Sequence, residues 1–187
     1  MTLLDHAMSY WERGFAVLPI DAEKKPPLQT WRRWQRERPS ERQLKTWFRR
    51  NGLTGLAVLC GRVSGGLGVR DFDDETAYED WRSANPDLAA TLPTVRTSRG
   101  YHVYFTGGID RILTLPDGEL RGAGYVLAPP SVHSDGWIYQ WIVPLSDGPP
   151  PVVDPVETGL LPAAAAPPNE SRATPPCVGS DPVQQRR

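Results

Sequence analysis

The chain is poor in cysteine and histidine and has no long hydrophobic run. Its two cysteines, Cys60 and Cys177, cannot form a disulfide framework, and with three scattered histidines they show no zinc-binding spacing. No segment reaches the ~18 consecutive apolar residues of a membrane-spanning helix. The first residues also lack the basic and apolar regions of a signal peptide. These absences predict a reduced, cytoplasmic protein with no membrane contact.

What is present is ordinary for a globular domain. The 187 residues are 39% hydrophobic and 23% charged, which fits one domain with or without a tail. The net charge of −1 is unevenly spread: residues 1–50 carry 11 Lys/Arg against 6 Asp/Glu, and residues 51–145 carry 7 against 11. A basic front beside an acidic middle is typical of proteins that hold polyanions and metal ions together. A solvated basic helix face is the simpler explanation of the same charges.

Proline marks the expected end of the domain. Half of the 20 prolines lie in residues 146–187, beside the alanine run 163–166, and no helical or strand periodicity is visible there. Such a segment cannot bury enough apolar surface to offset the entropy lost on ordering it. We therefore predict a folded domain over residues 1–145 and a disordered Pro/Ala-rich tail, or a linker stub, over residues 146–187.

Helices and strands alternate in the first half of the domain, and strands dominate the second half. Apolar residues at helical spacing predict a helix over residues 3–11, and Ser40 with Gln43 has the spacing of a capping box that opens a second. A third helix is predicted over residues 75–81. Strands are predicted around residue 95 and over residues 15–20, 56–59, 67–73, 101–105, 119–122, 125–128 and 137–142. The pattern indicates a single α+β domain.

Two aspartates, Asp71 and Asp73, carry the strongest chemical signal. Because strand side chains alternate between faces, they are expected to point the same way, roughly 7 Å apart. Neighbouring carboxylates repel each other, and binding of Mg²⁺ or Mn²⁺ removes the repulsion. The alternative is an acidic strand end in which Asp73 or Asp74 caps the next helix, and for an isolated pair this alternative is favoured.

Two further polar groups follow in the strand-rich half. Ser98, Arg99 and His102 form a cluster of donors suited to triphosphate oxygens, although a strand histidine can equally be structural. Glu119 and Arg121 also lie two residues apart and offer a third carboxylate and a phosphate-binding guanidinium. A surface ion pair is the alternative explanation for them.

The order and spacing of these pieces resemble the N-terminal primase–polymerase domain of the archaeo-eukaryotic primase superfamily, over about residues 5–142. The matching stretches are residues 14–19, Lys25-Pro26 before Trp31, residues 55–61, Asp71-Phe72-Asp73, Thr94, residues 98–102, residues 119–122, and residues 128–131 through Trp141. The resemblance implies a mixed-sheet domain in which a helix–strand unit joins a sheet similar to an RNA-recognition motif, with the site between them.

The resemblance also implies residue roles. Asp71, Asp73 and Glu119 stand at the catalytic and metal-ligand positions for Mg²⁺ or Mn²⁺. His102, with Ser98, Arg99 and Arg121, stands where relatives grip the nucleotide triphosphate.

The sequence departs from the family pattern at several points. Glu119 replaces an aspartate common in relatives, which leaves Asp117 and Asp110 as substitutes. Arg70 is unusual where an apolar residue is common, and by alternation it should face away from the carboxylates. The helicase region and zinc insertion of larger relatives are absent.

The function implied is a DNA primase/polymerase-type nucleotidyltransferase of plasmid, phage or mobile-element replication. Its partners are single-stranded or primer–template DNA, nucleoside triphosphates and a helicase encoded separately. Two alternatives stay open: a catalytically inactive DNA- or nucleotide-binding remnant of a longer primase–helicase, and a metal-dependent nuclease. The basic residues expected to follow the DNA backbone are Lys25, Arg32, Arg33, Arg36, Arg49 and Arg50. Trp31 and Trp34 are expected to pack in the core or to stack bases.

Overall fold

The structure, a computed structural model, describes residues 1–165, and the part of the predicted tail over residues 166–187 lies outside them. The helices in this range are α1 (Leu3–Glu12), α2 (Glu41–Trp47), α3 (Glu75–Ala84) and α4 (Pro86–Thr91), with 3₁₀ turns η1 (Arg32–Gln35), η2 (Arg62–Ser64) and η3 (Ala163–Ala165). The strands are β1 (Val17–Asp21), β2 (Leu53–Leu59), β3 (Leu67–Phe72), β4 (Thr94–Arg96), β5 (Tyr101–Thr106), β6 (Ile112–Leu115), β7 (Gly118–Arg121), β8 (Tyr125–Ala128) and β9 (Gln140–Val143). This content confirms the α+β class.

Side-chain caps fix where the helices begin. The predicted capping box of α2 is present, with the Ser40 hydroxyl accepting from the Gln43 amide and the Gln43 side chain accepting from the Ser40 amide. Asp74 caps α3 by accepting a 2.8 Å hydrogen bond from the amide of Thr76. The capping role considered for an aspartate after β3 therefore belongs to Asp74.

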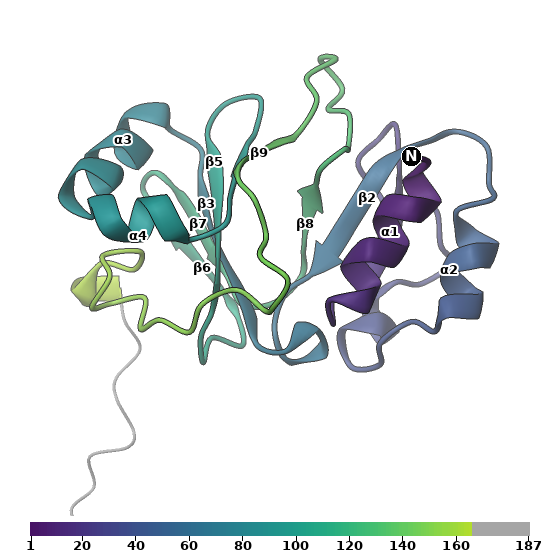
Figure 1. Cartoon of the computed structure of the whole chain (residues 1–187), viewed down its shortest axis with the longest axis horizontal. Helices are drawn as coiled ribbons and strands as arrows, with labels where there is room; N and C mark the ends of the chain where they lie inside the picture. The colour runs from purple at the N-terminus through teal and green to yellow at the C-terminus, as the bar shows by residue number, and fades with distance from the viewer. Residues whose placement is uncertain (166–187) are drawn as a thin grey trace, which may run out of the picture.

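The strands form two sheets that stand side by side (Figure 1). One has three strands in the order β1-β2-β8, and the other has six in the order β6-β7-β3-β5-β4-β9, with every pairing between these strands antiparallel. α1 and α2 lie against the smaller sheet, and α3 and α4 cover the outer face of the larger one. The arrangement confirms a helix–strand unit joined to a second sheet.

Each face of the larger sheet has its own core. Val69 and Tyr104 point inward and pack with α1, α2 and the smaller sheet. Phe72, Val103 and Leu120 point outward and pack under α3 and α4. Because strand side chains alternate, Asp71 shares the inner face with Val69, and Arg70 shares the outer face with Phe72. The predicted orientation of Arg70, away from Asp71, agrees with this alternation.

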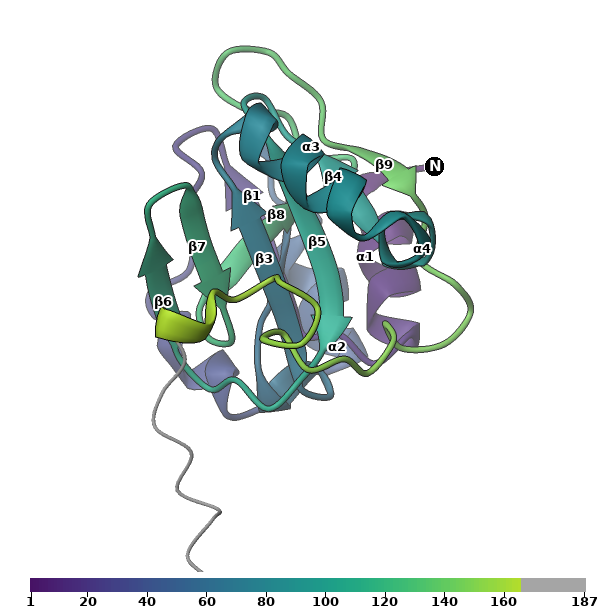
Figure 2. The ribbon, with the colours of Figure 1, turned by 90° about the vertical axis from the view of Figure 1, so that its left-hand side faces the viewer.

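Part of the segment assigned to the tail packs against the domain. The amide of Val153 donates to the carbonyl of Thr106 at 3.0 Å, and the Trp81 indole donates to the carbonyl of Thr158 at 2.9 Å. Leu160 and Leu161 are buried in the outer core. Figure 2 shows the segment crossing the outer side of the larger sheet. The packed part of the chain therefore extends past the boundary predicted at residue 145.

Two elements of the structure were not predicted from the sequence, α4 and β6. Both are short, and β6 is an edge strand whose side chains are mostly exposed. Over residues 1–165, none of the helices has the length and apolar character needed to span a bilayer.

Candidate functional site between the two sheets

Three strands of the larger sheet place a row of polar side chains on its inner face. Asp71 on β3 lies directly opposite His102 on β5 and directly opposite Glu119 on β7. Side chains opposed in this way start from Cβ atoms about 4.5–5.5 Å apart. The fold therefore gathers Asp71, His102 and Glu119, three of the residues predicted from the sequence, although 48 residues of chain separate the first from the last.

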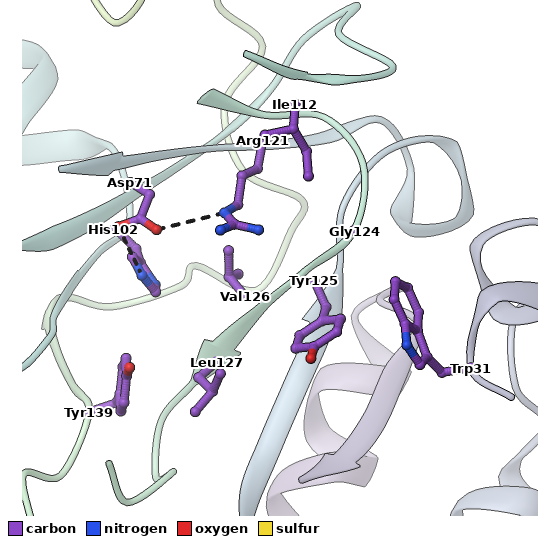
Figure 3. A pocket seen from close by; sticks show the side chains of 10 residues that line it. All are labelled: Trp31, Asp71, His102, Ile112, Arg121, Gly124, Tyr125, Val126, Leu127 and Tyr139. Carbon is purple, nitrogen blue, oxygen red and sulfur yellow. Dashed lines mark ion pairs between the residues drawn. The ribbon is translucent and has the colours of Figure 1, made fainter. Parts of the chain in front are cut away.

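Arg121 joins the two carboxylates of this row. Its Nε lies 3.7 Å from Asp71 Oδ2, and its Nη2 contacts Glu119 Oε2. On the other side of Asp71, His102 Nε2 lies 3.4 Å from Oδ1 (Figure 3). Burial by itself would raise the pKa of Asp71, but His102, Arg121 and Arg70 together hold that pKa below its ordinary value. Asp71 is therefore an ionised carboxylate at neutral pH.

The row opens into a cavity of about 370 Å³ between the sheets. Asp71, His102 and Arg121 line it on one side, and β8 of the smaller sheet lines it on the other. Within the described part of the chain, His102 Nδ1 and Arg121 Nε are buried without a hydrogen-bond partner. An unsatisfied buried polar group costs about 1–3 kcal/mol. Oxygen-rich anions such as phosphates supply the acceptors that Arg121, and His102 when protonated, require.

Asp73 departs from the predicted geometry. β3 ends at Phe72, so Asp73 lies in the bend that follows the strand. Its half-exposed side chain pairs with Arg99 at 3.1 Å. With Glu119 it lines a second cavity, not the cavity that Asp71 lines. The two aspartates therefore line different cavities.

Two glycines on the neighbouring segments, beside the end of β3, allow this close approach of the strands. Gly118, at φ +138°, lies where an added Cβ would stand 2.1 Å from the carbonyl oxygen of Asp71. Gly100 lies where a Cβ would stand 1.8 Å from the carbonyl oxygen of Phe72. Any larger residue at either position would push β5 or β7 away from β3. The two glycines thus let His102 and Glu119 approach Asp71 from both sides.

The carboxylates fit a divalent cation in chemistry but are already paired with arginines. Asp71 and Glu119 offer the hard oxygen ligands that Mg²⁺ and Mn²⁺ prefer, on adjacent strands, and Asp71 also lines the cavity. In residues 1–165, however, no group of three or more Asp, Glu, His or Cys side chains is placed as a ready metal cluster. Arg121 stands between two of the candidate ligands and Arg99 holds the third, Asp73.

Neither of the two carboxylates considered as substitutes for Glu119 lines the cavity that Asp71 lines. Asp117 pairs with the buried Arg70 at 2.6 Å. Asp110 is exposed before β6 and lines neither cavity. Glu119 is therefore the best-placed third carboxylate.

The remaining predicted residues lie outside the cavity wall. Ser98 and Arg99 lie in the turn between β4 and β5, where neither lines the cavity. The predicted DNA-contacting residues are all exposed, namely Lys25, Arg32, Arg33, Arg36, Arg49 and Arg50. Two of these pair with nearby acids, Lys25 with Glu23 and Arg33 with Glu37, each at 3.1 Å. Exposed pairs of this kind are weak and open readily.

Aromatic residues complete the cavity, and among them the sequence suggested a base-stacking role only for Trp31. Tyr125 and Tyr139 line it together with Trp31. The alternation along residues 125–128 indicated a strand but not which strand would face it. Only the meeting of β8 with the larger sheet brings Tyr125 to the cavity that Asp71 and Arg121 line.

The fold and site together define an α+β protein whose larger sheet presents a carboxylate, a histidine and an arginine to a cavity between two sheets, with a second carboxylate on the adjacent strand. The family is identified from the sequence. Residues 7–156 match the family described as bifunctional DNA primase/polymerase, N-terminal, and the chain belongs to this family. The match confirms the resemblance found in the motifs and supports a DNA primase/polymerase-type function. No curated protein sequence matches the chain.

Proposed function

We propose that the chain is a metal-dependent nucleotidyltransferase that adds nucleotides to a DNA strand in the replication of a plasmid, phage or other mobile element. The observation that supports this most directly is the row formed by Glu119, Asp71 and His102, with Arg121 beside it, which adjoins a cavity lined by Asp71, His102 and Arg121. The row combines carboxylates for cations with a histidine and a guanidinium for phosphates. Nucleotidyl transfer requires both kinds of group at one place.

Each residue has one role in this proposal. Asp71, Asp73 and Glu119 would hold two Mg²⁺ or Mn²⁺ ions, which supply charge neutralisation at the α-phosphate and activate the attacking 3′-hydroxyl. Asp73 can turn toward Glu119 at little energetic cost because its pair with Arg99 is exposed.

His102 and Arg121 would bind the triphosphate oxygens, with Ser98 and Arg99 at the rim. Binding in this way would hold the nucleotide next to the primer end, so that a bimolecular step becomes effectively unimolecular.

The exposed arginines of the N-terminal half, with Lys25, would hold the template backbone. These contacts predict binding to single-stranded or primer–template DNA that weakens as salt rises. A helicase encoded separately would supply unwound template. The free, buried thiol of Cys60 fits the reducing cytoplasm expected from the sequence.

One observation favours a second candidate, a nucleotide- or DNA-binding domain without catalytic activity. Arginine side chains neutralise all three candidate metal ligands: Arg121 pairs with Asp71 and Glu119, and Arg99 pairs with Asp73. A site that only binds phosphate gains from such fixed cations and needs no metal.

Incorporation of labelled nucleotides by the full chain distinguishes the two candidates. The protein is incubated with primer–template or bare single-stranded DNA, Mg²⁺ or Mn²⁺, and ribo- or deoxynucleotides. The proposal expects extension or new synthesis that Asp71→Asn abolishes and the matched control Asp110→Asn retains, because Asp110 lines neither cavity. DNA binding without synthesis under every condition overturns the enzyme in favour of the binding domain. Shortened DNA indicates a nuclease instead.

A further inference from the structure

The cavity between the sheets has two chemically different ends. Asp71, His102 and Arg121 lie at one end, and the aromatic rings of Tyr125 and Trp31 lie at the other (Figure 3). A volume of about 370 Å³ falls in the range of small-molecule sites. The two ends match the two halves of a nucleoside triphosphate, an anionic chain and a flat aromatic base.

The aromatic end is a built feature. The rings of Trp31 and Tyr125 meet edge to face, with centroids 5.1 Å apart and planes at 90°. The Tyr125 hydroxyl donates to the carbonyl of Lys24 at 3.2 Å, which fixes the tyrosine ring at the cavity wall. Both rings are only partly buried, so each keeps surface available to a ligand.

We propose that Trp31 and Tyr125 form the platform that stacks the base of the incoming nucleotide, while Arg121 and His102 hold its phosphates. This inference rests on the proposed nucleotide site and adds its base-binding half. Stacking on an aromatic ring tolerates every base because each base has a π face.

The walls around the platform offer little to read a base edge. The side chains of Ile112 and Leu127 have no hydrogen-bonding groups, and the Tyr125 hydroxyl is already bonded to Lys24. The platform therefore holds any of the four bases, with purines ahead of pyrimidines because of their larger stacking area. Selection among bases falls to the template.

Calorimetric titration of the full chain with dATP, dCTP and inorganic tripolyphosphate, in Mg²⁺ and without DNA, tests the platform. Trp31→Ala is expected to weaken dATP binding about fivefold to a hundredfold, the range for loss of one base–aromatic stack. Its binding of tripolyphosphate, which has no base, should not change. Trp31→Phe should retain most of the affinity for dATP because it keeps an aromatic face. Trp137→Ala is the matched control, since Trp137 is an exposed tryptophan on the β8–β9 loop, away from the cavity.

The outcomes separate the platform from the enzyme. The platform is overturned if Trp31→Ala binds dATP as tightly as the unchanged protein, or if it loses tripolyphosphate to the same extent. Wild-type protein that binds dATP no more tightly than tripolyphosphate overturns it as well. Arg121→Gln is expected to weaken both ligands. Base-dependent binding in a protein that makes no DNA supports the platform while refuting the polymerase.

Discussion

The guanidinium of Arg70 and the carboxylate of Asp117 form an ion pair of 2.6 Å between the end of β3 and the turn that joins β6 to β7. Arg70 also donates a 2.5 Å hydrogen bond to the carbonyl of Asp71 and lies over the ring of Phe72 at 4.0 Å. The pair thus ties the turn that precedes Glu119 to the strand that carries Asp71. An arginine that departs from the family pattern therefore supports the candidate site from the far side of its sheet.

The two halves of this pair should differ in what their loss costs. Arg70 is 3% exposed and Asp117 is 31% exposed. Asp117→Asn leaves a buried cation without its counter-charge, which costs about 3–5 kcal/mol of unfolding free energy. Arg70→Met leaves a carboxylate that water can reach and costs about 1–3 kcal/mol. Urea denaturation of both variants checks the order, and equal losses would refute the asymmetry.

The stability of the chain should fall in acid partly because of Asp71. Its pKa in the folded chain lies below the ordinary value of 3.8, so its ionised form stabilises the fold above that pH. This contribution disappears as the pH falls through the lowered pKa. Asp71→Asn should therefore be less stable than the unchanged protein at pH 7, and the gap should narrow between pH 5 and pH 3. Denaturation midpoints at each pH measure the gap, and a constant gap argues against an ionised Asp71.

Arg121 and a divalent cation should compete for the same two carboxylates. In Arg121→Gln, Asp71 and Glu119 lose the guanidinium that lies between them and repel each other more strongly, so the variant should unfold at a lower temperature in EDTA. Mn²⁺ should then stabilise the variant more than the unchanged protein, and a ligand at 100 times its Kd contributes about 2.7 kcal/mol. Arg111→Gln is the control, because Arg111 is exposed and lines no cavity wall. Equal Mn²⁺ effects in all three proteins would remove the case for a cation at this position.

Substitution of Asp73 should affect DNA synthesis much more than the stability of the fold. Its side chain and that of Arg99 are half exposed or more, so Asp73→Asn should change the unfolding free energy by at most about 1 kcal/mol. If Asp73 holds a metal ion as proposed, the same variant loses DNA synthesis. Arg99→Ala frees the carboxylate and should keep synthesis at low salt. Full synthesis by Asp73→Asn would assign Asp73 to its surface pair alone.

Local signals in the sequence predicted the parts of the fold that local physics decides. The capping box at Ser40 and Gln43 fixed the start of α2, and alternation placed His102 with Tyr104 on one face of β5. Only Asn85 separates the short helix α4 from α3, and the proline at the first position of α4 is the local signal of a second helix start. The exposed edge strand β6 carries little apolar alternation.

The candidate site depends on pairing between distant strands, which one sequence does not reveal. The types and spacing of Asp71, His102 and Glu119 predicted their chemistry, but their meeting follows from the antiparallel register of β5 and β7 on β3. β3 ends at Phe72, and Asp73 in the bend that follows lines a different cavity from Asp71. Tyr125 could not be predicted as a site residue from the sequence, because its place in the cavity depends on how the two sheets meet.

Residues beyond 145 should be needed for a stable domain. Leu160 is fully buried and Leu161 nearly so, against the outer face of the larger sheet. Leu160→Ala is expected to cost about 2–5 kcal/mol of unfolding free energy, because it leaves a cavity under α3 and α4. A chain ending at residue 145 should lose more and expose Phe105 and Trp81, while a chain ending at residue 165 should keep the packing described here. Thermal unfolding of the three proteins measures this, and equal stability of the 145-residue chain would restore the domain boundary expected from its proline content.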